Sequence, residues 1–179
     1  SKAGCKKWCE EEAQRYNDRY GIRSIAMRPF SVYGTGEHTK RGYANVISLF
    51  AWALMHGKTV EIWGDGSQTR DYIFVDDAAR GFILAFDALH RGDIKTQAFN
   101  LGTGIETTFN DVVRMIGEEM KIQPKVKYVP VPIKIYAERL LADMTRVNSV
   151  LGFEPRISVR EGIKRVIQAT RALPGDIQE

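Results

Sequence analysis

An arginine in a glycine-rich segment is the residue of this 179-residue chain with the clearest chemical potential. Arg70 follows the run Gly64-Asp65-Gly66-Ser67-Gln68-Thr69. The planar guanidinium of an arginine can donate hydrogen bonds to two oxygens of one phosphate, which lysine does less well. Arg70 is therefore predicted either to bind a phosphorylated ligand or to form an ion pair with the nearby Asp71 or Asp77.

Short strands are expected on both sides of this arginine. Val60 to Trp63 and Tyr72 to Val75 are rich in β-branched and aromatic residues. Gly64-Asp65-Gly66, which lies between them, tolerates the positive φ angles of a tight connection. The pattern predicts a hairpin that holds Arg70 on a rigid support.

The rest of the chain alternates between helical and extended patterns. Asp76 or Asp77 is expected to cap the helix that follows the arginine segment. The alternation predicts an α/β fold. Apolar spacing, capping residues and glycine stops predict five helices. The first ends near Tyr20 and the last begins after Ser158. The three between them run from Tyr43 to His56, from Ala78 to about Leu89 and from Thr108 to Met120. Further strands are predicted at Ile22 to Met27, Ala98 to Leu101 and Val126 to Val129.

The composition is that of an ordinary globular domain and argues against several classes of function. The net charge of +4 comes from basic residues interleaved with acids, and no nucleic-acid-binding motif accompanies them, so we expect no nucleic-acid partner. Cys5 and Cys9 lie one helical turn apart, which disfavours a disulfide; we expect reduced thiols that face the core, and no metal. No apolar run is long enough to span a membrane and no signal peptide opens the chain, which predicts a cytoplasmic protein without a membrane partner.

Several ordered blocks of the sequence resemble one family. The run from Gly64 to Asp77 is similar to the G-D-G-x-x-x-R-D-Y/F-I-x-V-D-D signature of the extended short-chain dehydrogenase/reductase superfamily. The resemblance is specifically to its NAD-dependent nucleotide-sugar epimerases and dehydratases, similar to UDP-glucose 4-epimerase. The other blocks that agree, in the same order, are Arg28 to Gly34, Phe99 to Gly104, Leu141-Ala142-Asp143 and Leu151 to Pro155.

The resemblance also implies which part of such an enzyme this chain is. Family members open with a G-x-x-G-x-x-G loop that binds the cofactor pyrophosphate, and nothing in this sequence matches that loop. Ser1-Lys2-Ala3-Gly4 resembles the end of the family's Tyr-x-x-x-Lys motif. Residues 1–173 are therefore expected to be the C-terminal substrate-binding part, with an incomplete Rossmann-type doubly wound sheet and a small substrate-binding lobe. Residues 174–179 are expected to be a tail, and the NAD-binding half is expected to be absent.

The family resemblance implies roles for individual residues on the cofactor side of the site. Lys2 matches the catalytic lysine that contacts the nicotinamide ribose and lowers the pKa of the catalytic tyrosine, because a nearby positive charge favours the phenolate. Pro29 and Phe30 match positions beside the nicotinamide pocket. NAD is accordingly implied as the cofactor of the complete enzyme, and it is not expected to bind this chain alone.

The implied substrate residues would bind a nucleotide-diphosphate sugar. Arg70 and Asn45 match residues that bind the diphosphate, and Trp63 matches a position near the base, whereas Ser31 stands where the epimerases usually carry asparagine. The R-x-G-D motif that precedes the Leu141 block in the family is absent, and Lys134 or Arg139 is the candidate for its arginine. Without a ligand role, Asn45 would make a helix-start hydrogen bond, Trp63 would be a core residue, and Lys134 and Arg139 would be solvated charges.

The expected activity is that of the nucleotide-sugar-binding part of an epimerase. Two alternatives stay open: a dehydratase, decarboxylase or reductase of the same superfamily, and a non-catalytic nucleotide-binding or interaction module. A parallel sheet without its N-terminal half would leave an apolar edge uncovered. We therefore expect a homo-oligomer or association with the missing half.

Overall fold

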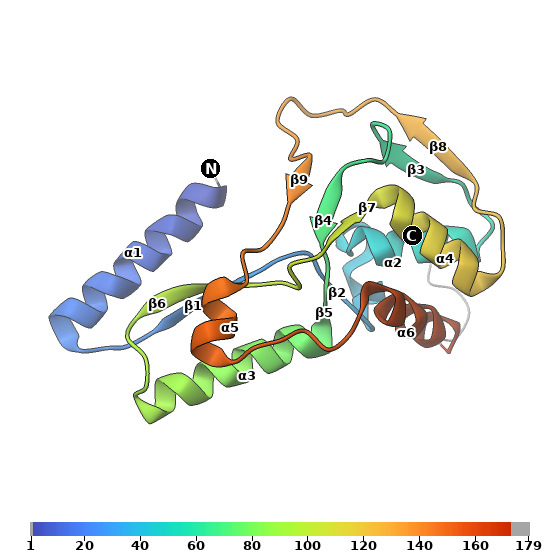
Figure 1. Cartoon of the computed structure of the whole chain (residues 1–179). Helices are drawn as coiled ribbons and strands as arrows, with labels where there is room; N and C mark the ends of the chain where they lie inside the picture. Colours follow the sequence, from blue (N-terminus) through green and yellow to red (C-terminus); the bar gives the residue numbers. More distant parts are fainter. Residues whose placement is uncertain (1, 173–179) are drawn as a thin grey trace.

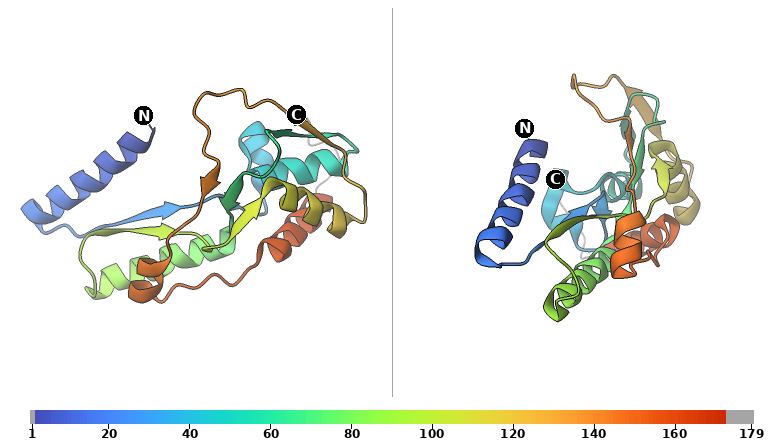
Figure 2. Two further views of the ribbon diagram at one scale, coloured as in Figure 1. Left: turned by 45° about the horizontal axis from the view of Figure 1, so that its top comes forward. Right: turned by 60° about the vertical axis from the view of Figure 1, so that its left-hand side comes forward.

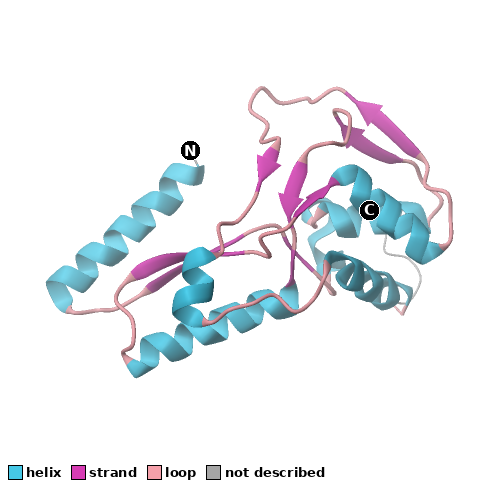
Figure 3. Ribbon diagram, in the orientation of Figure 1, coloured by secondary structure: helices cyan, strands magenta, loops and turns pink. Residues whose placement is uncertain are grey.

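The computed structural model describes residues 2–172, so the predicted tail at 174–179 lies outside the described residues. Helices and short strands alternate along this part of the chain (Figure 1, Figure 3). The helices are α1 (Lys2–Tyr20), α2 (Val46–Met55), α3 (Val75–Arg91), α4 (Phe109–Met120), α5 (Thr145–Leu151) and α6 (Val159–Arg171), with the 3-10 helix η1 (Glu37–Tyr43) before α2. The strands are β1 (Ile25–Pro29), β2 (Val32–Tyr33), β3 (Val60–Trp63), β4 (Thr69–Asp71), β5 (Ile73–Phe74), β6 (Gln97–Leu101), β7 (Glu106–Thr108), β8 (Val126–Val129) and β9 (Arg139–Leu140).

The strands pair mostly in parallel and mostly with partners far away in the sequence. β1 pairs with β6 in register from Ile25 opposite Gln97 to Pro29 opposite Leu101, and β2 pairs with β5. β3 pairs with β8. β4 lies between β7, which is antiparallel to it, and β9, which is parallel. The predicted α/β fold is therefore confirmed, with its sheet divided into short ladders.

The predicted hairpin around Arg70 is wrong. The pairing of β3 with β8 extends into the glycine segment, where the Gly64 amide donates to the Val129 carbonyl oxygen at 2.8 Å. Asn110 then holds the turn from the other side, because its side-chain amide donates to the Asp65 carbonyl oxygen at 3.0 Å. The chain therefore leaves β3 and joins a different ladder at β4, so the two strands that flank the turn never pair with each other.

Two apolar clusters form the core, and they lie on opposite sides of the β4–β5 segment. α2, α4 and α6 gather at one end of the molecule, while α3 and α5 lie against the β1–β6 pair at the other end (Figure 1). The first cluster includes Ile47, Phe50, Ile62, Tyr72, Phe74, Ile116 and Ile163. The second cluster includes Ile73, Ala88, Phe99, Leu101, Val147 and Phe153.

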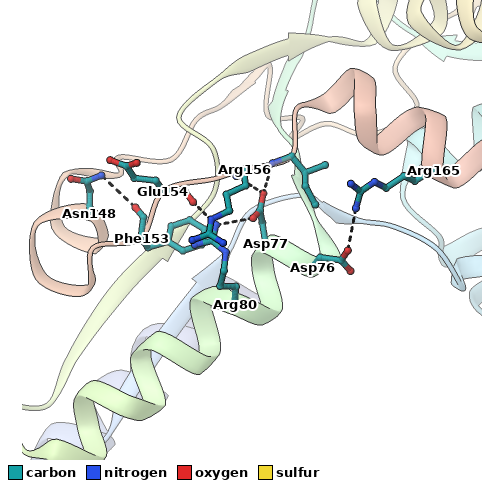
Figure 4. A network of polar contacts seen from close by, with 9 residues as sticks. Asp76, Asp77, Arg80, Asn148, Phe153, Glu154, Arg156 and Arg165 are labelled. Atoms are coloured by element: carbon teal, nitrogen blue, oxygen red, sulfur yellow. Dashed lines mark hydrogen bonds and ion pairs between the residues drawn. The ribbon is translucent and has the colours of Figure 1, made fainter.

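The acidic pair that follows the arginine segment does not cap a helix as predicted. α3 already begins at Val75, so both aspartates lie inside its first turn. The Asp77 carboxylate instead accepts hydrogen bonds from the backbone amides of Arg156 and Ile157, both at 2.8 Å, and from the Arg80 side chain at 2.8 Å (Figure 4). Asp77 therefore fastens the start of α3 to the segment that enters α6.

α1 stands apart from the rest of the molecule, as the two views in Figure 2 show. An ion pair from Arg28 of β1 to Glu10 connects it to the sheet, with Nε to Oε1 at 2.6 Å. Cys5 and Cys9 are free, as predicted, but both are exposed, so the prediction that they face the core is wrong. The reason is that no described element covers the face of α1 on which they lie.

Candidate functional site

β4 is the element that positions Arg70. The strand is held on both edges, because Arg70 pairs with Thr107 of β7 and with Leu140 of β9. Successive side chains along a strand point to opposite faces, so Arg70 and Asp71 leave this ladder in opposite directions. A three-stranded ladder therefore supports the arginine, in place of the predicted hairpin.

The Arg70 guanidinium lies over two aromatic rings. Its central carbon lies 5.5 Å from the centroid of the Phe109 ring and 5.3 Å from that of the Tyr136 ring. One of its nitrogens donates to the Thr69 carbonyl oxygen at 2.7 Å, and it forms no ion pair with any residue of the range 2–172. Ring faces attract a cation without neutralising its charge. The predicted ion pair with Asp71 or Asp77 is therefore absent, and the half-buried charge has no anionic partner among residues 2–172.

Asp71 has a different function, which the sequence analysis did not foresee. Its buried carboxylate accepts hydrogen bonds from the Thr103 amide and hydroxyl, both at 2.7 Å, from the Gly104 amide at 2.9 Å and from the Ala142 amide at 3.2 Å. A Cβ atom on Gly102 would lie 2.6 Å from this carboxylate, which explains the glycine. The Gly102-Thr103-Gly104 turn thus wraps around Asp71 and connects β4 with the segments on both sides of it.

A cavity of about 480 Å³ opens beside β4. Trp63 lines it, with 40% of the residue exposed, and its ring centroid lies 6.0 Å from that of Tyr136. The predicted Trp63 is therefore at a surface cavity and not in the core, and Tyr136 connects it with Arg70. The remaining lining residues are Gly64, Asp65, Ser67, Gln68, Thr69, Glu106, Val131, Glu138 and Arg139.

Arg139 lines the cavity but already has an anionic partner. Its guanidinium contacts both carboxylate oxygens of Glu106, with Nε to Oε1 at 2.6 Å and the second contact at 3.1 Å. The hydrogen bond from Arg139, and then the one from the Thr69 hydroxyl, hold the pKa of Glu106 below its ordinary value. Lys134 is exposed on the loop between β8 and β9 and does not line the cavity. Of the two candidates for the second phosphate-binding cation, Arg139 is the one at the cavity.

The other predicted site residues lie outside this cavity. Asn45 caps α2: its side-chain oxygen accepts from the Ile47 amide at 3.1 Å, and its side-chain nitrogen donates to the Val32 carbonyl oxygen at 3.1 Å. These are the bonds of the helix-start alternative, and a substrate contact stays a prediction. Pro29, Phe30 and Ser31 lie at the carboxyl end of β1, and Lys2 is the first residue of α1.

The described residues do not form a complete dinucleotide site. The carboxyl ends of β1 and β6 lie side by side, which is where ligands bind in open parallel sheets. A pyrophosphate also needs a glycine-rich loop that leads from a strand into a helix. Within residues 2–172, α3 and α4 follow strands directly, and the segment from β9 to α5 contains no glycine. Neither α2 nor α6 follows a strand, so none of these helices begins with such a loop.

Between residues 2 and 172 there is neither a cluster of metal ligands nor a membrane-spanning helix. Within residues 2–172, no three His, Cys, Asp or Glu side chains come together as a metal site. Over the same range, every helix is too short or too polar to cross a bilayer. What the described site can do chemically is hold an anion at Arg70 beside aromatic rings.

Comparison with known proteins places this geometry in a family. The model of the NAD dependent epimerase/dehydratase family matches residues 3–102. The UDP-glucose 4-epimerase of Mycolicibacterium smegmatis is 34% identical over 156 residues, which cover 87% of this chain and 48% of that protein.

Solved structures agree with this assignment. UDP-glucose 4-epimerase from Thermotoga maritima, solved with UDP-glucose, superposes with a TM-score of 0.82 at 31% identity, over 90% of this chain and 50% of that one. UDP-N-acetylglucosamine 4-epimerase from Methanobrevibacter ruminantium, solved with UDP-N-acetylmuramic acid, superposes with a TM-score of 0.84 at 26% identity, over 93% and 52%. The chain spans about half the length of these relatives. The chain belongs to the NAD-dependent epimerase/dehydratase family and is similar to UDP-glucose 4-epimerases.

Proposed function

We propose that this chain is the C-terminal, nucleotide-sugar-binding part of an NAD-dependent nucleotide-sugar 4-epimerase of the UDP-glucose 4-epimerase type. The observation that carries the proposal is the Arg70 guanidinium, which contacts two aromatic rings and has no ion-pair partner among residues 2–172. It lies in the segment that resembles the family's signature, beside the cavity lined by Trp63. Relatives of known structure that were solved with UDP-sugars support the same substrate class.

In the proposed complex, the diphosphate and the base of the nucleotide each contact a side chain of suitable chemistry. The diphosphate binds Arg70 in a charge-assisted contact. The base stacks on the exposed part of Trp63. Arg139 supplies a second positive charge at the cavity when Glu106 yields one of its contacts. Residues 1–173 would form this substrate-binding part, and Lys2 would act beside the nicotinamide in the complete enzyme.

UDP is expected to bind the chain measurably, and uridine is expected to bind more weakly because it has no phosphate for Arg70. Isothermal titration of the 179-residue chain with UDP, uridine and NAD tests this. NAD is expected not to bind, because the described residues offer no complete pyrophosphate cradle. A chain that binds NAD but not UDP would overturn the proposal.

The chain is also expected to associate through the apolar surfaces of α1 and α3. Phe82, Ile83 and Phe86 of α3 are 47%, 60% and 66% exposed, and Trp8 of α1 is 59% exposed. Exposed apolar groups gathered in this way favour a partner, which would be a second copy or the NAD-binding half. Sedimentation velocity is expected to show species larger than the monomer. Phe86→Ser should reduce them, whereas a wild-type monomer at high concentration would contradict the expectation.

A further inference from the structure

The loop between β8 and β9, residues 130–138, arches away from the molecule and returns beside β4 (Figure 1). We call this segment the strap. All of its residues are exposed except Tyr136, which is half-buried. Val131, Tyr136 and Glu138 of the strap line the cavity. Tyr136 is the least exposed of these three, and its ring lies near both Arg70 and Trp63.

Gln68 holds Tyr136 in this place. Gln68 is 6% exposed, and its side-chain nitrogen donates to the Trp63 carbonyl oxygen at 2.8 Å and to the Tyr136 hydroxyl at 3.3 Å. Within residues 2–172, the Tyr136 hydroxyl makes no other hydrogen bond. One buried amide therefore connects the end of β3, which carries Trp63, with the strap.

Resting on the proposed nucleotide function, we propose that Gln68 is a positioning residue for the nucleotide pocket. Its amide keeps the Tyr136 ring over the Arg70 guanidinium and beside the Trp63 ring. Gln68 acts through Tyr136 and not through the ligand. The ring in turn keeps water from one face of the guanidinium, which strengthens the contact of that charge with a phosphate.

Substitutions of Gln68 and Tyr136 should have coupled effects on ligand binding. Gln68→Leu removes the amide and keeps the side-chain volume similar, and Tyr136→Phe removes the same hydrogen bond from the other side. Loss of this bond is expected to weaken UDP binding about threefold to tenfold in Tyr136→Phe. Gln68→Leu should weaken it by at least as much, because it also removes the bond to the Trp63 carbonyl oxygen. The double variant should be no weaker than Gln68→Leu, because Gln68→Leu has already removed the bond that Tyr136→Phe removes. Gln123→Leu and Tyr43→Phe, at exposed positions outside this contact, are the matched controls.

A second measurement follows the strap without any ligand. Trypsin cleaves after Lys134, which is exposed in the middle of the strap. Release of Tyr136 should increase cleavage after Lys134 about threefold to tenfold, since cleavage follows the population of the open segment. The controls should be cleaved at the wild-type rate.

The outcomes separate the two proposals. If the wild-type chain does not bind UDP, the proposed function is overturned, and with it the nucleotide role of Gln68. If the wild-type chain binds UDP, and Gln68→Leu and Tyr136→Phe bind it with the same Kd, the positioning role alone is overturned. Additive losses in the double variant would also overturn it. Faster cleavage together with coupled, non-additive losses of affinity supports it.

Discussion

Replacement of Asp71 by alanine is expected to lower the free energy of unfolding by about 3–5 kcal/mol. The carboxylate is fully buried and accepts hydrogen bonds from the amides of Thr103, Gly104 and Ala142 and from the Thr103 hydroxyl. Without it, three backbone N–H groups lose their acceptor and a cavity is left. Urea denaturation followed by circular dichroism measures the loss.

Two further variants make the Asp71 prediction sharper. Asp71→Asn keeps one acceptor oxygen but turns an NH₂ group toward amide donors. Its free energy of unfolding should therefore lie between those of the wild type and Asp71→Ala. Asp87→Ala, at an exposed position on α3, is the control and should change stability by less than about 0.5 kcal/mol. Equal free energies of unfolding for Asp71→Ala and Asp87→Ala would show that the Asp71 carboxylate does not stabilise the fold.

Replacement of Arg70 by alanine is expected to weaken UDP binding by roughly tenfold to over a hundredfold. A charge-assisted contact to a phosphate contributes about 1.5–3 kcal/mol, which corresponds to that range. Uridine affinity should hardly change, because uridine has no phosphate. Titration calorimetry of wild type and variant with both ligands measures the difference.

The Arg70 prediction has two controls. Arg70→Lys keeps the charge and loses the planar fork, so its UDP affinity should be intermediate. Arg114→Ala removes an exposed arginine that is paired with Asp111 and Glu118 on α4, and it should leave UDP binding unchanged. UDP affinity that is the same in wild type and Arg70→Ala would remove Arg70 from the site.

Local signals in the sequence predicted the local elements well. Thr108 caps α4 by accepting from the Asp111 amide, and Ser158 caps α6 in the same way through Glu161. β8 covers the predicted range Val126 to Val129. These features depend on neighbours within a few residues, and such neighbours can be read directly from a sequence.

The errors concern partners that are distant in the sequence. β3 pairs with β8, not with the predicted strand at Tyr72 to Val75, and Asp77 binds amides near residue 156 instead of capping its own helix. The sequence suggests Asp71 only as a partner for Arg70. A signal for its real role was present, because a Gly-x-Gly turn offers several free amides to one buried carboxylate, but the pairing itself depends on the fold.

The cavity was predicted in part. Trp63 and Arg139 line it, and Arg70 contacts it through Tyr136. Family resemblance supplied those residues, whereas Gln68 and Tyr136 carry no signature in the sequence that relates them. Their contact exists because the strap returns to β4 after a long excursion, and no local pattern predicts such a return.

The position of the β4–β5 segment has a consequence for cooperativity. Tyr72 and Phe74 belong to one apolar cluster, while Ile73 between them belongs to the other. Neither cluster can melt without disturbing the backbone that the other one shares. A nucleotide bound at Arg70, two residues before Tyr72, would therefore stabilise both clusters together through mass action on the native state. Probes at either end of the molecule would then detect the bound ligand as the same shift of one unfolding transition.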